Sequence, residues 1–286
     1  MFIMNIYHKV ILIIFICCSC GVDAQIPASK ETLRICSFNI HYDKENDSIR
    51  SWNARKKMVL DLITTYNFDL VGAQEVKQSQ LSDFKAMDIY GTIGEGINGG
   101  NSGMQNTILY KKTRFALLDS GIFWLSERPE IPSRGWDATY QRNCSWGKFR
   151  DNISGKEFFM FNTHFDHEGD EAKINSAYLI YQKITEIANE TPALFMGDLN
   201  SEPDSEAIMF LNKKLTNTRE ASESTPTGPY GTGHGFRITT NVRRIDYIFS
   251  TKEKLSVKTY ETIEKLYNGK APSDHFPVFI TIDFLP

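Results

Sequence analysis

Short polar segments lie on or directly after strand-like apolar runs at six places in this chain, and this arrangement constrains the fold more than any other feature. Strands that end at one edge of a sheet bring their terminal side chains together, so we expect these segments to share one rim of a β-rich domain. They are Ser37-Phe38-Asn39, Gln74-Glu75, Asn162-Thr163-His164, Gly197-Asp198-Leu199-Asn200, Ser273-Asp274-His275, and Asp246 within Arg244–Phe249.

The order of the apolar runs predicts a four-layer α/β sandwich, in which two packed mixed β-sheets are flanked by helices. Runs with a period near 3.6 predict helices, and short alternating or continuous apolar runs predict strands. Helices separate some strands while other strands follow each other directly, which favours mixed sheets. The predicted strands are 33–40, 68–73, 107–110, 116–118, 121–125, 145–150, 157–162, 192–196, 245–250 and 278–284, and the predicted helices are 53–66, 78–87 and 170–189.

Two of the predicted helices have a defined apolar stripe. In helix 53–66 the residues expected to face the core are Met58, Leu60, Leu62 and Ile63. The residues of this helix expected to face water are Arg55, Lys56 and Lys57. In helix 170–189 the residues expected to face the core are Ile174, Ala177, Tyr178, Tyr181 and Ile184.

Residues 1–24 are predicted to be a signal peptide. The unbroken apolar run Val10–Cys18 is too short to cross a bilayer as a helix but suits a signal-peptide core, and Ala24 ends a small-residue cleavage site. Two alternatives stay open: lipoprotein processing with the lipid on Cys20, and a retained anchor. We expect export to the periplasm, the outer-membrane surface or the extracellular space.

Residues 25–286 are predicted to form one domain, because no Pro/Gly/Ser-rich linker and no repeat divides them. We expect a monomer without a transmembrane segment in the mature chain. Only Cys36 and Cys144 follow the leader, so the fold cannot rest on disulfides, and two separate buried thiols are favoured over one bridge. The net charge of −3 disfavours, without excluding, a nucleic-acid substrate.

Glu75 and Asn39 are candidates for holding a divalent cation, since each comes at the end of a predicted strand and can face a cleft. Mg²⁺ takes oxygen ligands and keeps several waters, so one or two carboxylates and an amide are enough to bind it. Asp274 is a third candidate, for the cation or for a water molecule. An exposed glutamate and an asparagine in a turn are the alternative for either residue taken alone.

Asp198 and Asn200 are candidates for the chemical step. Gly197 permits a tight exit from the preceding strand. If the chain stays extended, the side chains of Asp198 and Asn200 point to the same side. A carboxylate there can align or deprotonate a water molecule, and an amide can bind a phosphoryl oxygen without adding negative charge. The alternative is an Asx-type turn before Glu202.

His275 and His164 are candidates for stabilising negative charge on a phosphoryl group. Asp246 is the expected partner of His275, because an unpaired carboxylate in its hydrophobic strand would be costly. A structural histidine is the alternative for each one alone, but it is disfavoured when all six segments are considered together. Irregular His/Asp spacing without cysteine ligands disfavours zinc.

Taken together, these residues resemble the endonuclease/exonuclease/phosphatase superfamily, which includes deoxyribonuclease I. The resemblance runs from about residue 32 to the C-terminus and implies a four-layer sandwich with Mg²⁺- or Mn²⁺-dependent phosphoester hydrolysis by direct water attack. The implied roles are metal binding for Asn39 and Glu75, phosphate binding for His164 and Asn200, water activation for Asp198, a catalytic pair for Asp246 and His275, and an acidic neighbour for Asp274.

The subfamily and the substrate are less constrained. The strand Arg243–Tyr247 departs from the Trp-x-Asp-Arg-Ile signature of the inositol polyphosphate 5-phosphatases, which argues against an inositide substrate. The segments Phe123–Ser126, Gly135–Asp137 and Asn162–His167 resemble a bacterial secreted branch, nearer the deadenylase and sphingomyelinase types.

Arg142 is a candidate contact for a substrate phosphate, with a surface ion pair as an equal alternative. The sequence therefore predicts an exported phosphodiesterase or phosphatase that acts on an undetermined nucleic acid, lipid or sugar phosphate. A nuclease and a sphingomyelinase-like enzyme are the alternatives. A non-catalytic binding module is disfavoured because every polar segment is intact.

Overall fold

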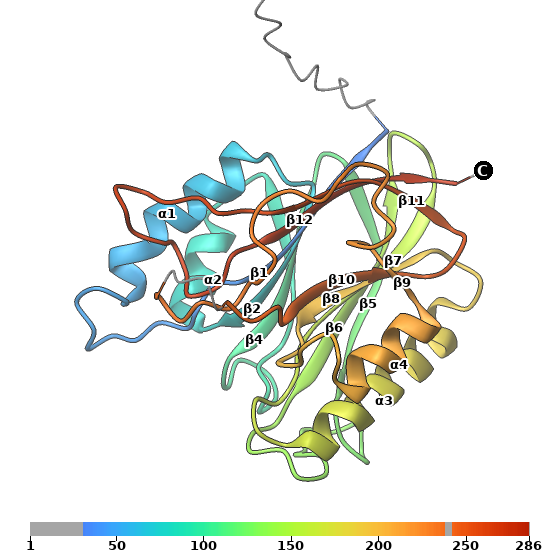
Figure 1. Ribbon diagram of the computed structural model, residues 1–286, viewed down its shortest axis with the longest axis horizontal. Coiled ribbons are helices and arrows are strands. Elements are labelled where there is room, and N and C mark those ends of the chain that lie inside the picture. Colours follow the sequence, from blue (N-terminus) through green and yellow to red (C-terminus); the bar gives the residue numbers. More distant parts are fainter. Residues whose placement is uncertain (1–30, 238–241, 286) are drawn as a thin grey trace, which may run out of the picture.

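Two six-stranded β-sheets pack face to face in the computed structural model, which describes residues 31–237 and 242–285 (Figure 1). The first sheet has the spatial order β11 (Leu255–Thr262), β12 (Val278–Phe284), β1 (Leu33–Asn39), β2 (Leu70–Val76), β4 (Gln105–Lys111) and β3 (Tyr90–Ile93). The second has the order β5 (Phe115–Trp124), β6 (Asn143–Asp151), β7 (Glu157–His164), β8 (Ala193–Asp198), β10 (Asp246–Ser250) and β9 (Thr216–Asn217).

Within the described residues, four helices cover the outer faces of the two sheets. α1 (Trp52–Thr65) and α2 (Gln78–Lys85) lie on the first sheet, while α3 (Asp170–Ala188) and α4 (Glu206–Lys214) lie on the second (Figure 1). Three buried apolar clusters fill the three interfaces, represented by Phe38 under α1 and α2, Met160 between the sheets and Phe195 under α3 and α4. The predicted four-layer α/β sandwich is therefore confirmed.

The pairing of the strands gathers their ends at one rim. β1 and β2 are parallel in the first sheet, and β7 and β8 are parallel in the second, so the carboxyl ends of each pair meet. The antiparallel strand β10 begins beside the end of β8, with Asp246 opposite Asp198. β12 runs antiparallel to β1, which brings the residues before β12 to the same rim. Five strands and the segment before β12 thus direct polar side chains to one place.

Several elements differ from the prediction. Segments 116–118 and 121–125 belong to one strand, β5, with a register shift between Leu117 and Asp119. β3, β9 and β11 were not predicted, because their apolar residues are few or interrupted by polar and charged ones. α4 was not predicted because its continuous apolar run, Ala207–Leu211, is too short to show helical periodicity. Cys36 and Cys144 are separate buried thiols, as predicted, and burial raises the pKa of each.

Two side chains face the opposite way from the prediction. Tyr178 is 43% exposed and packs edge-on against Phe210 of α4 at a centroid distance of 4.4 Å, because α3 approaches its sheet through smaller residues such as Ala177. Arg55, expected in water, is 1% exposed. Helical periodicity cannot distinguish a solvated arginine from one whose five donors are satisfied inside the protein.

Arg55 ties the start of α1 to two loops at the polar rim. Its guanidinium donates to the carbonyl oxygens of Arg50 (2.8 Å), Ile40 (2.7 Å), Pro272 (2.8 Å) and His41 (2.9 Å). Burial lowers its pKa to about 10, so it remains charged at neutral pH. The loops that follow β1 and precede β12 are therefore fixed to each other through one side chain.

No helix in the described ranges is long and apolar enough to span a membrane. The predicted signal peptide, its cleavage site and Cys20 lie outside the described residues.

We expect Arg55→Met to lower the free energy of unfolding by about 2–4 kcal/mol, because four buried carbonyl oxygens lose a charged donor. Urea denaturation measures this change. Lys56→Met on the same helix is the matched control; its exposed ion pair with Asp83 should contribute less than about 1 kcal/mol. Equal effects of the two substitutions would contradict the structural role of Arg55.

Candidate active site

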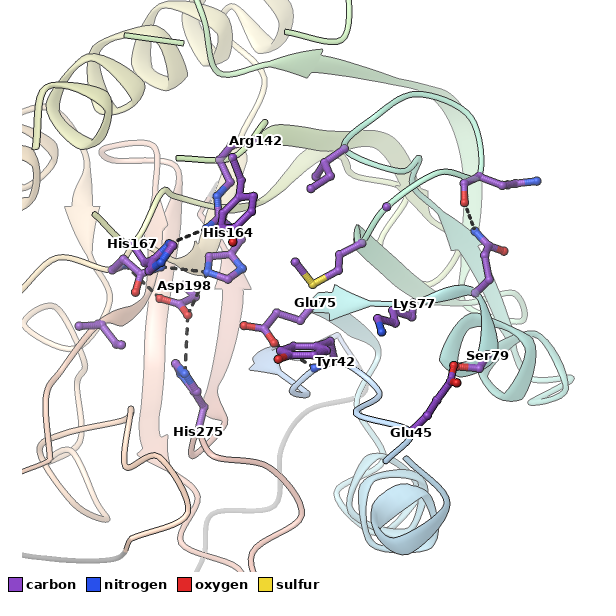
Figure 2. Close-up of a pocket in the computed structure, with 18 of the residues that line it drawn as sticks. Tyr42, Glu45, Glu75, Lys77, Ser79, Arg142, His164, His167, Asp198 and His275 are labelled. Atoms are coloured by element: carbon purple, nitrogen blue, oxygen red, sulfur yellow. Dashed lines mark hydrogen bonds and ion pairs between the residues drawn. The ribbon is translucent and has the colours of Figure 1, made fainter. Parts of the chain in front are cut away.

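A cavity of about 900 Å³ opens at the polar rim. Figure 2 shows His164, Asp198 and His275 at one end, Glu75 and Tyr42 in the middle, and Lys77, Ser79 and Glu45 at the other end. The lining comes from both sheets and from the loops between them. A space of this kind, with titratable groups gathered at one end, is the usual form of a small-molecule site.

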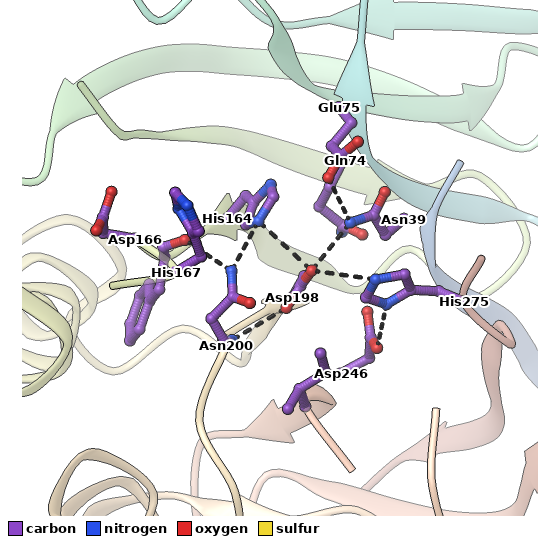
Figure 3. Close-up of polar contacts among 12 residues, drawn as sticks. Asn39, Gln74, Glu75, His164, Asp166, His167, Asp198, Asn200, Asp246 and His275 are labelled. Atoms are coloured by element: carbon purple, nitrogen blue, oxygen red, sulfur yellow. Dashed lines mark hydrogen bonds and ion pairs between the residues drawn. The ribbon is translucent and has the colours of Figure 1, made fainter. Parts of the chain in front are cut away.

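Asp198 lies at the centre of the polar contacts (Figure 3). It is 2% exposed, and its Oδ2 accepts a hydrogen bond of 2.9 Å from Asn39 Nδ2, across the interface between the sheets. The same oxygen lies 3.4 Å from His164 Nε2 and 3.7 Å from His275 Nε2. Burial and the charge of Asp246 raise the pKa of Asp198 above its ordinary value, which makes its carboxylate a stronger base.

The exit from β8 is a tight turn, so the extended conformation considered for this segment does not occur. A Cβ on Gly197 would lie 2.0 Å from the carbonyl oxygen of Thr163, so only glycine fits there. Asn200 adopts a left-handed conformation with φ of 46°, and its N–H donates to Asp198 Oδ1 at 3.0 Å. The Asx-type turn is therefore present, and it directs both side chains into the cavity.

His275 and Asp246 form a buried pair. His275 Nδ1 lies 2.8 Å from Asp246 Oδ2, and the ring presents Nε2 toward Asp198 (Figure 3). Burial lowers the pKa of His275, but the carboxylates of Asp246 and Asp198 outweigh it, so the pKa is well above its ordinary value. The ring is therefore an imidazolium at neutral pH, suited to donating a hydrogen bond to a negatively charged oxygen.

His164 has the opposite charge preference. Its Nε2 lies 2.9 Å from Asn200 Nδ2, and burial, followed by the positive charge of Arg142, lowers its pKa well below the ordinary value. His164 is therefore neutral at neutral pH. The two histidines beside Asp198 thus differ in charge: His275 is positive and His164 is neutral. They differ because His275 is paired with Asp246 and His164 is not.

The candidate metal residues gather at the end of β1. Asn39 Nδ2 donates to Glu75 Oε1 at 3.1 Å, and Glu75 sits at an irregularity in the β2–β4 pairing with a left-handed φ of 64°. Asp274 and Glu75 flank the ring of His41, whose Nδ1 lies 3.1 Å from Asp274 Oδ2 and 3.9 Å from Glu75 Oε2. Three oxygen-bearing side chains from three segments therefore surround one small volume.

A separate acidic group also has the spacing of a metal site. The ligand atoms of Asp198, Asp246 and His275 all lie within 4.8 Å of one another. The two carboxylates raise the pKa of His275 and so stabilise its protonated form. A cation bound there would have to displace that proton. The oxygen set around Asn39, Glu75 and Asp274 is the better match for a hard cation such as Mg²⁺.

Other residues of the predicted segments hold the two sheets together beneath the cavity. Gln74 Nε2 donates to Asn162 Oδ1 at 2.7 Å, and Asn162 Nδ2 donates to the carbonyl oxygens of Ala73 and Thr107, each at 3.0 Å. Ser273 Oγ donates to the carbonyl oxygen of Asn39 at 2.6 Å. Their burial satisfies backbone groups at the rim, so these residues are structural.

Arg142 lies inside the cavity. It is 5% exposed, with Nε 3.5 Å from Asp166 Oδ2 and Nη2 3.5 Å from His167 Nδ1. Arg142 therefore has an ion pair, which is buried and not at the surface as considered, and the contact with a substrate phosphate stays a prediction for a residue that lines the cavity. Several lining residues were not predicted, although each lies close to a strand end. Tyr42, Lys77 and His167 follow β1, β2 and β7, whereas Tyr140 and Arg243 precede β6 and β10.

The comparison with known proteins decides the family. The model of the endonuclease/exonuclease/phosphatase family matches residues 36–275. The chain belongs to this family. A member from Bacteroides vulgatus has a crystal structure that is 36% identical, with a TM-score of 0.86 over 90% of this chain and all of that one (100%). The chain is therefore a phosphoester hydrolase.

Two further relatives show the range of the family match. A mannosyl-6-phosphatase of Bacteroides thetaiotaomicron is 32% identical, with a TM-score of 0.81 over 89% of this chain and 100% of that one. A protein of Acanthamoeba polyphaga mimivirus is 26% identical over 243 residues, which cover 71% of this chain. The match spans only 35% of the viral protein, about a third of its length.

The pairing of Asp166 with the loop that carries Arg142 predicts a pH dependence of stability. Burial raises the pKa of Asp166, but the backbone N–H groups of Gly169, Thr139, Glu168 and Tyr140 outweigh this and lower it to about 2. A carboxyl with a depressed pKa stabilises the fold above its unfolded pKa, near 3.9. That contribution is lost as the pH falls from about 4 to about 2.

We therefore expect Asp166→Asn to lower the free energy of unfolding at pH 7 by about 1–2 kcal/mol and to flatten its decline between about pH 4 and pH 2. Urea denaturation across this pH range measures both effects. Asp88→Asn at an exposed position serves as the control. An unchanged acid profile in Asp166→Asn would show that these hydrogen bonds do not set the pKa of Asp166.

Proposed function

We propose that this protein is a divalent-metal-dependent phosphatase that hydrolyses a small phosphorylated carbohydrate by in-line attack of water. The observation that carries the reaction type is the position of the Asp198 carboxylate, between the candidate metal residues on one side and two histidines of different charge on the other. The catalytic residues in this proposal are His164, Asp198, Asn200, Asp246 and His275.

Asn39, Glu75 and Asp274 would hold Mg²⁺ or Mn²⁺. The carboxylate oxygens of Glu75 and Asp274 match the donor type that these ions prefer, and the Asn39 amide lies beside Glu75. The three side chains come from the ends of β1 and β2 and from the loop before β12. A cation bound there would polarise the phosphoryl group and offset its negative charge. Arg142 lines the wall of the cavity and would donate two hydrogen bonds to the same phosphate.

Asp198 is the proposed base. Its raised pKa makes it able to take a proton from an attacking water molecule. The imidazolium of His275, oriented by Asp246, would donate Nε2–H to a phosphoryl oxygen as charge develops in the transition state. Asn200 and neutral His164 would bind the phosphoryl oxygens from the other side. Because neither carries a positive charge, they would not lower the basicity of Asp198.

The dimensions and charge of the cavity support a small substrate. A volume of about 900 Å³ accommodates a phosphorylated mono- or disaccharide, and hydroxyl-binding side chains such as Glu45, Ser79 and Asn101 line its far end. The net charge of −3 offers little attraction to a polyanion such as RNA. The 32% identity with the mannosyl-6-phosphatase supports the same substrate class.

We expect Asp198→Asn to lower kcat by about 10³-fold or more while leaving the melting temperature unchanged or higher. Because the pKa of Asp198 is raised, ionised Asp198 lowers the free energy of unfolding, and this effect grows as the pH rises. A neutral asparagine at this position removes the effect. Steady-state kinetics and thermal unfolding check the two effects, with exposed Asp119→Asn as the control. Full activity in Asp198→Asn would exclude it as the base.

Release of phosphate or alcohol from a panel of substrates tests the proposed class. The panel holds mannose 6-phosphate, glucose 6-phosphate, bis-p-nitrophenyl phosphate, an RNA oligomer, plasmid DNA and sphingomyelin. We expect the hexose 6-phosphates to give the highest kcat/KM with Mg²⁺ or Mn²⁺, and EDTA to abolish turnover. Preferred cleavage of RNA or DNA, with an affinity that falls steeply with salt, would indicate a nuclease instead.

We propose further that the enzyme is exported, on the support of the leader pattern in residues 1–24. The mass of the mature protein purified from a bacterial host tests this. A chain that begins at Gln25 indicates cleavage of a signal peptide, and a lipid-modified chain that begins at Cys20 indicates a lipoprotein. Recovery of the full-length chain from the cytosol would contradict export.

A further inference from the structure

Both the backbone and the ring of His41, in the loop after β1, are held in place by several contacts. Its φ of 56° is left-handed, a conformation that costs a non-glycine residue about 1–2 kcal/mol. Three hydrogen bonds fix its backbone: the N–H donates to Asn39 Oδ1 at 3.0 Å, and the carbonyl oxygen accepts from Arg55 Nη2 and Gln80 Nε2, each at 2.9 Å.

The ring of His41 is fixed as well. It packs against Tyr42 at a centroid distance of 4.9 Å and meets the ring of Phe236 edge-on at 5.1 Å. The side chain is 12% exposed. Its Nε2 is buried and finds no hydrogen-bond partner among the residues that the structure describes. The ring is therefore held in one position beside the proposed cation ligands, and Nδ1 is the nitrogen that faces them.

Nδ1 of His41 lies among the carboxylates of the proposed cation site, at distances that suit a hydrogen bond to Asp274 and also shared coordination of one cation. Two atoms bound to one octahedral cation at about 2.1 Å lie roughly 3.0 Å apart when adjacent and about 4.2 Å apart when opposite. Nδ1 of His41 lies 3.1 Å from Asp274 Oδ2 and 3.9 Å from Glu75 Oε2, within this range. His41 therefore occupies the same coordination volume as the carboxylates proposed above for the cation.

We propose that His41 is a nitrogen ligand of the catalytic cation and that it makes the site prefer Mn²⁺ over Mg²⁺. The inference rests on the proposed metal site. Both ions bind well to oxygen ligands, but Mn²⁺, as a transition metal, accepts an imidazole nitrogen more readily than Mg²⁺ does. A site of amide and carboxylate oxygens alone would accept Mg²⁺ readily. One nitrogen donor therefore shifts the relative affinity of the site from Mg²⁺ toward Mn²⁺.

Substitution of His41 tests this proposal without relying on turnover. His41→Asn replaces the imidazole nitrogen by an amide oxygen, and asparagine tolerates a left-handed backbone. His41→Gly removes the side chain altogether, and glycine adopts this φ freely. His167→Asn, at a histidine that also lines the cavity but lies beside Arg142, is the matched control. Circular dichroism and thermal unfolding verify that each variant is folded.

Titration calorimetry with Mn²⁺ and with Mg²⁺ measures the affinities, and pulsed electron paramagnetic resonance of bound Mn²⁺ reports a coordinated nitrogen. In the unsubstituted protein we expect tighter binding of Mn²⁺ and a nitrogen coupling. Both His41 variants should lose the coupling and bind Mn²⁺ about 10–100-fold more weakly, with a change of less than about threefold for Mg²⁺. His167→Asn should keep the coupling and both affinities.

The outcomes separate this proposal from the proposed function. Mn²⁺ that binds without a nitrogen coupling, or a coupling that persists in His41→Asn and His41→Gly, would overturn the role of His41 and leave a metal-dependent hydrolase intact. Turnover in EDTA, together with no measurable binding of either cation, would overturn both.

Discussion

The hydrogen bond from Asn39 Nδ2 to Asp198 Oδ2, 2.9 Å long, joins the ends of two strands that belong to different sheets. The rest of the site depends on it. Asn39 also contacts Glu75 on the side of the candidate cation, while Asp198 contacts His164 and His275 on the side of the candidate phosphate. A shift between the two sheets would therefore separate the metal residues from the base, and the packing of the sheets becomes a condition of the chemistry.

The polar segments at the strand ends combine residues with two tasks. One member of a segment is buried and satisfies backbone groups or ties the sheets together, as Gln74 and Asn162 do. Its neighbour, one or two residues further along, faces the cavity, as Glu75 and His164 do. A change of a single residue in register would exchange the tasks of Gln74 and Glu75, because successive side chains of a strand point to opposite faces. The site is precise because its supports lie in the same strands.

The sequence was sufficient to predict the sandwich and to locate the segments at its rim, because strand ends and polar residues are both local signals. It could not predict contacts that depend on tertiary geometry. Arg55 has the spacing of a solvated helix face but is buried against carbonyl oxygens of three segments. His41 follows Asn39 by two residues, yet nothing local indicates that its ring lies between Glu75 and Asp274. The difference in charge between His164 and His275 likewise arises from burial and neighbours brought together by folding.

Direct attack of water on phosphorus, without a covalent phosphoenzyme, is the central claim of this account. The stereochemical course of hydrolysis tests it most directly, using a substrate made chiral at phosphorus with sulfur and an oxygen isotope and hydrolysed in water labelled with a third isotope. A single in-line displacement, activated by Asp198, predicts inversion of configuration. Retention of configuration would require two displacements through a phosphorylated side chain, and would contradict the role assigned to Asp198.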